Sequence, residues 1–264
     1  VPDSFVVHTE EIKKELLNYN GVDPRYHPIF VIDGIPHYDT YLRTPRTGRE
    51  QFFRELGLDP AKKLILFVPP ADGILVDPDA NQRILELLTS IPMAQVLVRF
   101  PLVGSTLLEK IAPPPGIAYD KPQAPFKSLT SHTMELSKKV DAHLADSLFH
   151  SDIVFSGPSS IAIDAAFFGK PIMFIGFDKS MHGIKRRKSV ILFLEYTHLK
   201  SIVETGSVRV ARSPDDLRAA VEAYLKDPLL DEKGRRAIVE KNVSVHGNAG
   251  AGERLASYLV SQLP

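Results

Sequence analysis

Short apolar segments alternate with longer amphipathic segments along the whole sequence, and this alternation constrains the fold more than any other feature. The short segments are rich in β-branched side chains, as expected for strands that are buried on both faces. They occupy residues 5–8, 29–33, 64–68, 95–100, 116–119, 152–155, 172–175 and 208–211. The longer segments carry apolar side chains at helical spacing, which predicts helices over residues 10–19, 48–56, 81–88, 137–149, 159–168 and 214–225. We therefore expect an α/β fold in which helices cover both faces of a parallel sheet.

Charge balance and composition narrow the class of protein. Lys and Arg together number 32, as do Asp and Glu, so no overall field attracts nucleic acid or an anionic membrane. The chain has 0 cysteines, which excludes disulfides, thiolate metal sites and a cysteine nucleophile, and which suits a reducing compartment. It shows neither an apolar run long enough to span a bilayer nor a signal-peptide pattern. We therefore expect a cytoplasmic protein without a nucleic-acid partner.

The last of the predicted helices carries its own start signals. Ser213 stands at the cap position and Pro214 at the first helical position. Asp215 and Asp216 follow in the first turn, where the positive end of the helix dipole favours acids. These signals predict that the helix begins at Pro214.

The segment from Asp152 to Pro171 carries the strongest local signal for a ligand site. An apolar strand runs into a turn of small residues at Gly157, and the following helix opens with the hydroxyls of Ser159 and Ser160. The first N–H groups of a helix have no partner inside the helix and lie at the positive end of its dipole, so they favour anions. The carboxyl end of a parallel strand is also where open α/β sheets hold ligands. Phosphate is therefore the expected guest of this turn.

Residues of this segment also have interpretations that require no ligand. Ser159 can simply cap the helix while Gly157 and Pro158 form the turn. Asp164 lies one helical turn beyond Ser160, where it can reach the ribose hydroxyls of a ligand, stabilise the helix dipole or face solvent. Local chemistry alone leaves these alternatives open.

Further polar residues fall at the same predicted edge of the sheet. His182 follows the strand over residues 172–175, and a basic stretch at residues 185–188 comes next. This loop can contact a diphosphate or an anionic acceptor, or it can form a solvated charged surface. Arg99 ends another predicted strand, and it can bind a ligand or serve as an ordinary strand-end arginine. Structural roles are expected for three other histidines, His132, His143 and His198.

Taken together, these motifs resemble the donor-nucleotide half of the GT-B superfamily. That superfamily includes glycosyltransferases, CDP-glycerol glycerophosphotransferases and the hydrolysing UDP-N-acetylglucosamine 2-epimerases. The segment over residues 152–171, which ends in Gly169-Lys170-Pro171, carries most of the resemblance. Supporting matches lie at His8-Thr9-Glu10, residues 32–39, residues 98–101, Arg235, His246-Gly247-Asn248 and Glu253-Arg254. The resemblance implies a Rossmann-like donor domain.

The resemblance also implies roles for the candidate residues. In the superfamily, a strand, a turn of small residues and a helix with an internal acid hold the diphosphate and ribose of the donor. The residues implied to bind the donor are Gly157, Ser159, Ser160 and Asp164, with Arg99 and His182 as further candidates. We expect base recognition near residues 117–121. No metal is expected, because no His, Asp and Glu grouping has ligand spacing and catalysis in this superfamily generally needs none.

Departures from the superfamily patterns leave the substrates open. Val68-Pro69-Pro70-Ala71 stands where the epimerases carry a His-Arg and Glu-Asn signature, which argues against an epimerase. The glycerophosphotransferases commonly show an Asp-Tyr-Ser-Ser turn, whereas this chain has Ser156-Gly157-Pro158-Ser159-Ser160. Phe100 replaces a common histidine. Donor and acceptor therefore remain open.

The resemblance divides the chain into three parts. Residues 1–43 are expected to be the tail of an N-terminal domain and the interdomain crossing, residues 44–240 the donor domain, and residues 241–264 a C-terminal crossover helix. Because the chain opens almost directly into a strand-like stretch after Val1, we expect the natural protein to start earlier. The catalytic base is expected in the N-terminal domain, so this chain alone would bind nucleotide but turn over poorly.

The implied function is transfer of a glycosyl or glycerophosphoryl group from a nucleotide-activated donor to a hydroxyl acceptor. The product would be a surface polysaccharide or glycoconjugate, and the full-length protein could associate peripherally with a membrane. Two alternatives stay open. The chain could be a non-catalytic α/β module that uses the same sheet edge for protein contacts, or a hydrolysing epimerase.

Overall fold

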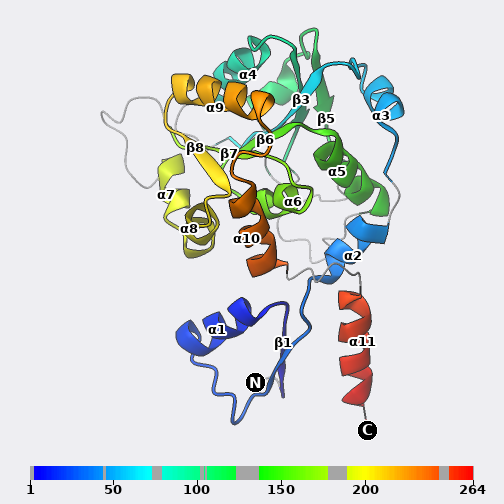
Figure 1. Cartoon of the computed structure of the whole chain (residues 1–264), viewed down its shortest axis with the longest axis vertical. Coiled ribbons are helices and arrows are strands. Elements are labelled where there is room, and N and C mark those ends of the chain that lie inside the picture. The colour runs from blue at the N-terminus through cyan, green and yellow to red at the C-terminus, as the bar shows by residue number, and fades with distance from the viewer. Residues whose placement is uncertain are drawn as a thin grey trace. The chain divides into compact units, whose positions relative to one another are not determined.

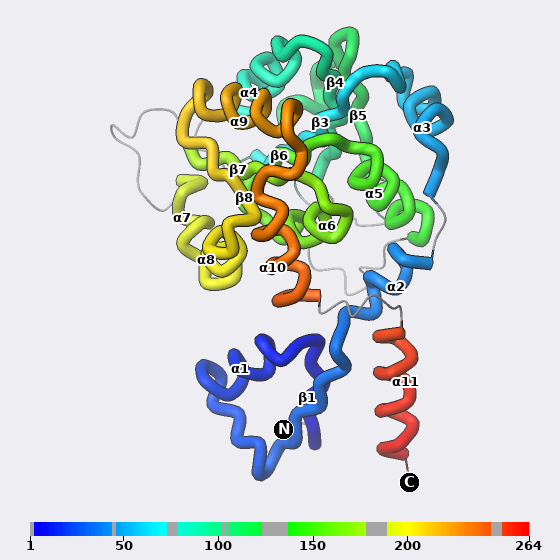
Figure 2. The backbone as a smooth tube through the Cα atoms, in the orientation of Figure 1, coloured from blue at the N-terminus to red at the C-terminus, as the bar shows by residue number. Residues whose placement is uncertain are grey.

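The computed structural model describes residues 3–43, 46–72, 79–101, 104, 106–122, 137–177, 189–243 and 250–263. The chain forms two compact units (Figure 1). The larger comprises residues 46–235, and the smaller combines residues 1–45 with residues 236–264. The backbone in Figure 2 shows that both ends of the chain belong to the smaller unit. In the described residues, no helix is long and apolar enough to cross a membrane.

The larger unit is built on a six-stranded parallel sheet. Its strands are β3 (Lys63–Val68), β4 (Ala94–Arg99), β5 (Ile117–Asp120), β6 (Ile153–Ser156), β7 (Ile172–Ile175) and β8 (Val208–Ala211). They lie in the order β5-β4-β3-β6-β7-β8, and each neighbouring pair is parallel. This arrangement confirms the predicted α/β, Rossmann-like fold. Each predicted strand of this unit also lies within about one residue of its observed position.

Helices cover both faces of this sheet (Figure 1). On one face α4 (Ala80–Thr89) and α9 (Pro214–Lys226) pack over a core that includes Phe67, Leu88 and Leu217. On the other lie α5 (Lys138–His150) and α6 (Ile161–Phe167). The other helices described in this unit are α3 (Arg49–Glu55), the 3-10 helix η1 (Leu107–Lys110), α7 (Val190–Leu194) and α8 (Thr197–Glu204). Helix α10 (Glu232–Asn242) begins in this unit and continues into the smaller one.

Helix starts explain which helices could be predicted. The signals before α9 are confirmed, because the Ser213 hydroxyl accepts a hydrogen bond from the Asp216 N–H at 3.1 Å and Pro214 begins the helix. In contrast, α10 is rich in charge and contains Gly234, so it lacks a clear apolar stripe and helical periodicity alone did not predict it. Gly234 is required there, since a Cβ would lie 2.3 Å from the carbonyl carbon of Gly206.

The smaller unit contains the two-stranded parallel sheet of β1 (Phe5–Val7) and β2 (Ile29–Val31). Helix α1 (Glu10–Tyr19) follows β1 over the predicted residues. Helix α2 (Pro36–Arg43) was not predicted, since its residues were interpreted as part of the crossing between domains. Helix α11 (Ala251–Ser261) comes from the far end of the chain. The three-part division of the chain stays a prediction.

Candidate functional site

The strand order creates a topological switch point between β3 and β6. From β3 the chain continues to β4 on one side, and from β6 it continues to β7 on the other. The connections after these two strands therefore diverge, and in open α/β sheets ligands are commonly held at the carboxyl edge beside such a point. Val68 at the end of β3 pairs with Ser156 at the end of β6. The predicted phosphate turn, residues 157–160, follows directly on this switch point.

Gly157 allows the two segments at the switch point to pack closely. A Cβ on Gly157 would lie 3.1 Å from Cβ and 3.3 Å from Cγ of Pro70, which follows β3. These separations are shorter than ordinary van der Waals contact, so a side chain at Gly157 would push the turn away from Pro70. The glycine therefore fixes how near the turn approaches the loop after β3.

Two serines follow Gly157 and Pro158 and lead into helix α6. Ser160 occupies the N-cap position and makes no side-chain capping hydrogen bond. The alternative that Ser159 only caps the helix stays open. Ser160 is exposed and Ser159 is half-buried. Because α6 is a short helix, hydroxyl and N–H donors, rather than the helix dipole, would bind a phosphate here.

Asp164 shares a helix side with Ser160. It lies in the first turn of α6 and is half-buried. Residues four apart on a helix lie on the same face, so a ligand held at Ser160 can extend toward Asp164. This is the relation that a diphosphate and its ribose require, and Asp164 stays the predicted ribose ligand.

Two buried polar side chains at the switch point were missed by the sequence analysis. Ser156 is fully buried, and its Oγ has no hydrogen-bond partner among the described residues. Asn81 of α4 donates from Nδ2 to the Pro70 carbonyl oxygen at 3.0 Å, while its buried Oδ1 also has no partner in that part of the chain. Buried polar atoms without partners are rare and are commonly explained by a bound water or ligand. They therefore mark the switch point as a place where further polar groups fit.

Arg99 forms a buried ion pair at the end of β4. Its guanidinium contacts Oδ2 of Asp120 on the neighbouring strand β5 and reaches the Val140 carbonyl oxygen at 3.5 Å. His143 Nε2 lies 3.5 Å from the same Asp120 oxygen. Arg99 is only 5% exposed, so its charge is held mainly inside the protein. The prediction that Arg99 contacts a donor remains a prediction.

A pocket of about 300 Å³ opens beside this pair. Asp120, Lys121 and His143 line it together with Ser137 and Lys139 at the start of α5. It lies at the carboxyl ends of β4 and β5, next to residues 117–121, where base recognition is predicted. The pocket combines a polar lining with a volume at the small end of the range for ligand sites.

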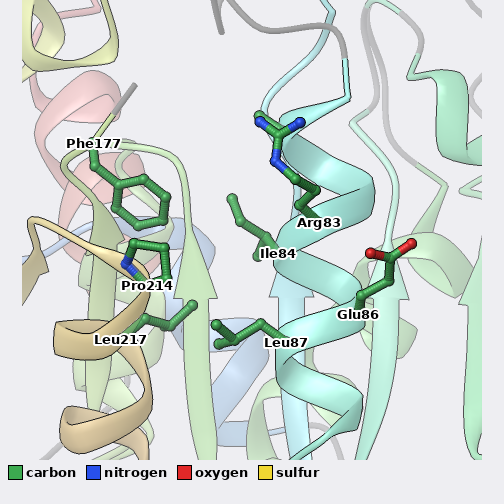
Figure 3. Close-up of a pocket in the computed structure, with 8 residues that line it drawn as sticks. Arg83, Ile84, Glu86, Leu87, Phe177, Pro214 and Leu217 are labelled. Atoms are coloured by element: carbon green, nitrogen blue, oxygen red, sulfur yellow. The ribbon is translucent and has the colours of Figure 1, made fainter. Parts of the chain in front are cut away.

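A larger pocket, of about 500 Å³, lies between α4 and α9 (Figure 3). Ile84 and Leu87 of α4 face Phe177, Pro214 and Leu217 across it. These facing side chains are hydrocarbon, and the charged lining residues Arg83 and Glu86 lie on α4 alone, so the two walls do not together supply the donors that a phosphate and a ribose need. We therefore place the candidate nucleotide site at the switch point and not between these helices.

Several candidates lie outside the described residues. His182, the basic stretch at residues 185–188 and the segment at residues 246–248 belong to this group. Within the described residues, no group of three His, Asp or Glu side chains is placed to hold a metal ion.

Known proteins match this chain in three-dimensional structure, whereas the searches by sequence found no match. No family model matches the chain, and no curated protein matches it. Solved structures match over nearly its whole length. A Listeria monocytogenes protein assigned as a UDP-N-acetylglucosamine 2-epimerase matches with a TM-score of 0.60 and 16% identity, over 98% of this chain and 59% of its own.

Two further structures show the range of the match. The Methanocaldococcus jannaschii UDP-GlcNAc 2-epimerase, in complex with UDP-GlcNAc and UDP, has a TM-score of 0.59 and 15% identity, over 98% of this chain and 61% of its own. The wall teichoic acid polymerase TagF has a TM-score of 0.56 and 15% identity, over 98% of this chain and 57% of its own. The chain thus spans about three-fifths of the length of these structures. At such low identity the match establishes the fold alone, and the chain shares the Rossmann-like α/β architecture of the matching part of these structures.

Proposed function

We propose that this chain is the donor-binding part of a GT-B type transferase. The enzyme would move a glycosyl or glycerophosphoryl group from a nucleotide-activated donor to a hydroxyl acceptor, in the synthesis of a surface polysaccharide or glycoconjugate. The switch point carries the proposal. It combines a close-packed turn of small residues, a serine hydroxyl that makes no capping hydrogen bond, and buried polar atoms without partners among the described residues. Its position at the carboxyl edge of the sheet is where folds of this class hold nucleotides.

Each group at this edge has a proposed role. The N–H groups and hydroxyls of residues 157–160 bind the diphosphate, and Asp164 binds the ribose. The pocket beside Asp120 and Lys121 receives the base. Arg99 acts through Asp120 by fixing its carboxylate at the pocket wall. His182 stays a predicted ligand of the diphosphate or of an anionic acceptor.

Charge development explains why the turn suits transfer chemistry. When the acceptor hydroxyl attacks, the bond between the transferred group and the phosphate oxygen of the nucleotide breaks, and negative charge grows on the leaving nucleotide. In glycosyl transfer this leaving group is a nucleoside diphosphate, and in glycerophosphoryl transfer it is a nucleoside monophosphate. Donors fixed at residues 157–160 stabilise that charge without rearrangement at the moment of reaction. The acceptor proton must pass to a base, which we place in a domain that precedes residue 44, so nucleotide binding is the activity to test with this chain.

An epimerase acting on UDP-N-acetylglucosamine is the second candidate. The structures with TM-scores of 0.60 and 0.59 support it, since both are of proteins given that activity. Pro69 and Pro70 stand against it, because they occupy the loop where epimerases carry charged and polar residues. Incubating the chain, extended upstream where the natural protein is longer, with UDP-N-acetylglucosamine would decide the matter. Release of UDP with a 2-epimerised sugar favours the epimerase, and an unchanged substrate counts against it.

Calorimetric titration with UDP, CDP and GDP tests the proposed function. We expect at least one of these nucleotides to bind, and Ser160→Ala and Asp164→Ala to weaken binding while the fold persists. If none of the three binds to the parent chain, the donor-binding function is wrong. If one binds and neither substitution matters, the function stands but the site lies elsewhere.

A further inference from the structure

Helix α11 begins without a capping side chain of its own. Its N-cap residue is Gly250, and Asp39 of α2 supplies the missing acceptors. Asp39 Oδ1 accepts from the N–H groups of Gly250 at 2.9 Å and Ala251 at 3.3 Å, and Oδ2 accepts from the N–H of Gly252 at 2.9 Å. One carboxylate thus pairs three successive donors at the start of a helix that follows it by more than two hundred residues.

A side chain of α11 also contacts the chain upstream of Asp39, at the start of residues 32–43. Arg254 donates from Nε to the Ile32 carbonyl oxygen and from a terminal nitrogen to the Asp33 carbonyl oxygen, both at 2.7 Å. These carbonyls belong to a sharp turn after β2, in which Asp33 has φ +53° and Gly34 has φ +146°. A residue other than glycine in the left-handed region is uncommon and persists where its surroundings hold it.

Helix α11 packs closely against Gly34 of this turn. A Cβ on Gly34 would lie 3.0 Å from Cβ of Ala251, so the turn and the first residue of α11 are in direct contact. Further along, the ring of Tyr258 stacks on Phe30 at 4.0 Å between centroids. The helix is therefore joined to β2, the turn and α2 along most of its length.

We propose that α11 is a strap that sets the conformation of residues 32–43. When the strap is docked, Arg254 and Ala251 hold the Asp33–Gly34 turn in its left-handed form and Asp39 closes the helix start. When the strap leaves, the turn loses both constraints and relaxes to ordinary backbone angles. Residues 32–43 lead by main chain into the larger unit. Docking of α11, from the far end of the sequence, therefore determines the backbone conformation of this connecting segment.

Hydrogen exchange of the full chain, measured by mass spectrometry, tests the coupling in both directions. Asp39→Ala, on the connection, should speed exchange about tenfold across α11. Arg254→Met, on the strap, should speed exchange across residues 32–43 by a similar factor. Asp39→Asn keeps one acceptor oxygen and should give an intermediate effect on α11.

A neighbouring charge on the same helix provides the control. Glu253 precedes Arg254 and, among the described residues, forms an exposed ion pair with Arg43, so Glu253→Gln should change exchange by less than about twofold. Peptides from β3 and β6 report whether each variant still folds, and Arg254→Met decides the case if Asp39→Ala does not fold. The strap is disproved if α11 keeps its protection in Asp39→Ala, or if each substitution alters exchange only in its own segment.

Discussion

The amino edge of the larger sheet and the switch point at its carboxyl edge differ in how their polar groups are paired. At the amino edge, Asp152 accepts from the Lys63 ammonium at 2.9 Å and from the Leu64 N–H at 2.9 Å. Arg49 donates to three carbonyl oxygens, those of Pro60, Lys62 and His150. At the carboxyl edge, Ser156 Oγ and Asn81 Oδ1 have no partner among the described residues, and Ser160 makes no capping bond.

This difference separates stability from binding within one sheet. Paired groups at the amino edge hold the loops between strands and helices in place, whereas the unpaired groups at the switch point retain their capacity for a ligand. Substitutions at the amino edge should therefore lower the free energy of unfolding and leave nucleotide affinity unchanged. Substitutions at the switch point should weaken nucleotide binding and leave the free energy of unfolding nearly unchanged.

The largest expected effect is at the amino edge. Arg49→Met removes three hydrogen bonds to carbonyl oxygens and a cation–π contact, in which the guanidinium lies 4.2 Å from the Phe53 ring centroid. We expect the free energy of unfolding to fall by about 3 kcal/mol. Urea unfolding followed by circular dichroism measures this, since the chain has 0 tryptophans. A fall below about 1 kcal/mol would show that the amino edge contributes less than its contacts indicate.

The matching effect at the carboxyl edge is on affinity. Ser160→Ala should weaken nucleotide binding about tenfold, or about 1.4 kcal/mol, because a hydroxyl donor to the diphosphate is lost. The free energy of unfolding should change by less than about 0.5 kcal/mol, since Ser160 is exposed and caps nothing. Ser257→Ala, at an exposed serine of α11, is the matched control and should alter neither quantity. If Ser160→Ala lowered the free energy of unfolding as much as Arg49→Met, the contrast between the switch point and the amino edge would be wrong.

A smaller effect distinguishes an unpaired hydroxyl from a paired one. Ser156→Ala deletes a buried Oγ that has no partner in the described residues, so the free energy of unfolding should stay the same or rise by up to about 1 kcal/mol. Ser147→Ala provides the comparison, because Ser147 Oγ is also buried but donates to the His143 carbonyl oxygen at 2.7 Å. Its loss should be destabilising. If Ser156→Ala destabilises as much, the hydroxyl has a partner such as a buried water.

The smallest expected effect concerns pH at the amino edge. Burial lowers the pKa of His150 below its ordinary value of 6.5, although a hydrogen bond to the Thr47 carbonyl oxygen opposes this. The folded state therefore prefers the neutral imidazole, and this contribution is fully present above pH 6.5 and is lost as pH falls through the folded pKa. Unfolding measured on both sides of pH 6.5 should show a smaller acid loss for His150→Gln than for the parent. Equal losses would contradict the assignment.

Elements that depend on local pattern were predictable from sequence. The strands of the larger unit follow from short β-branched segments, and α9 follows from Ser213 and Pro214. The turn at Gly157 was recognisable because small residues separate a buried strand from a helix. The resemblance to GT-B proteins predicted the fold that the structural comparisons support. These features require only neighbours in the chain.

Features that depend on distant segments were not predictable. The Arg99 to Asp120 pair requires the register of β4 on β5, and the Asp39 contacts with α11 join opposite ends of the sequence. The unpaired state of Ser156 and Asn81 is a property of packing, so a strand-end serine and a helix-start asparagine carry no sign of it. Gly234 likewise appears as a poor helix residue until its contact with Gly206 is seen.

Chemical-shift mapping of a saturating nucleotide titration tests most directly whether the carboxyl edge is the binding edge. With UDP or CDP, we predict the largest amide shifts at Gly157, Ser159, Ser160 and Asp164, with further shifts at Asp120 and Lys121. Amides at the amino edge, such as those of Arg49 and Asp152, should not move. Shifts confined to the pocket between α4 and α9, or at the amino edge, would contradict the account.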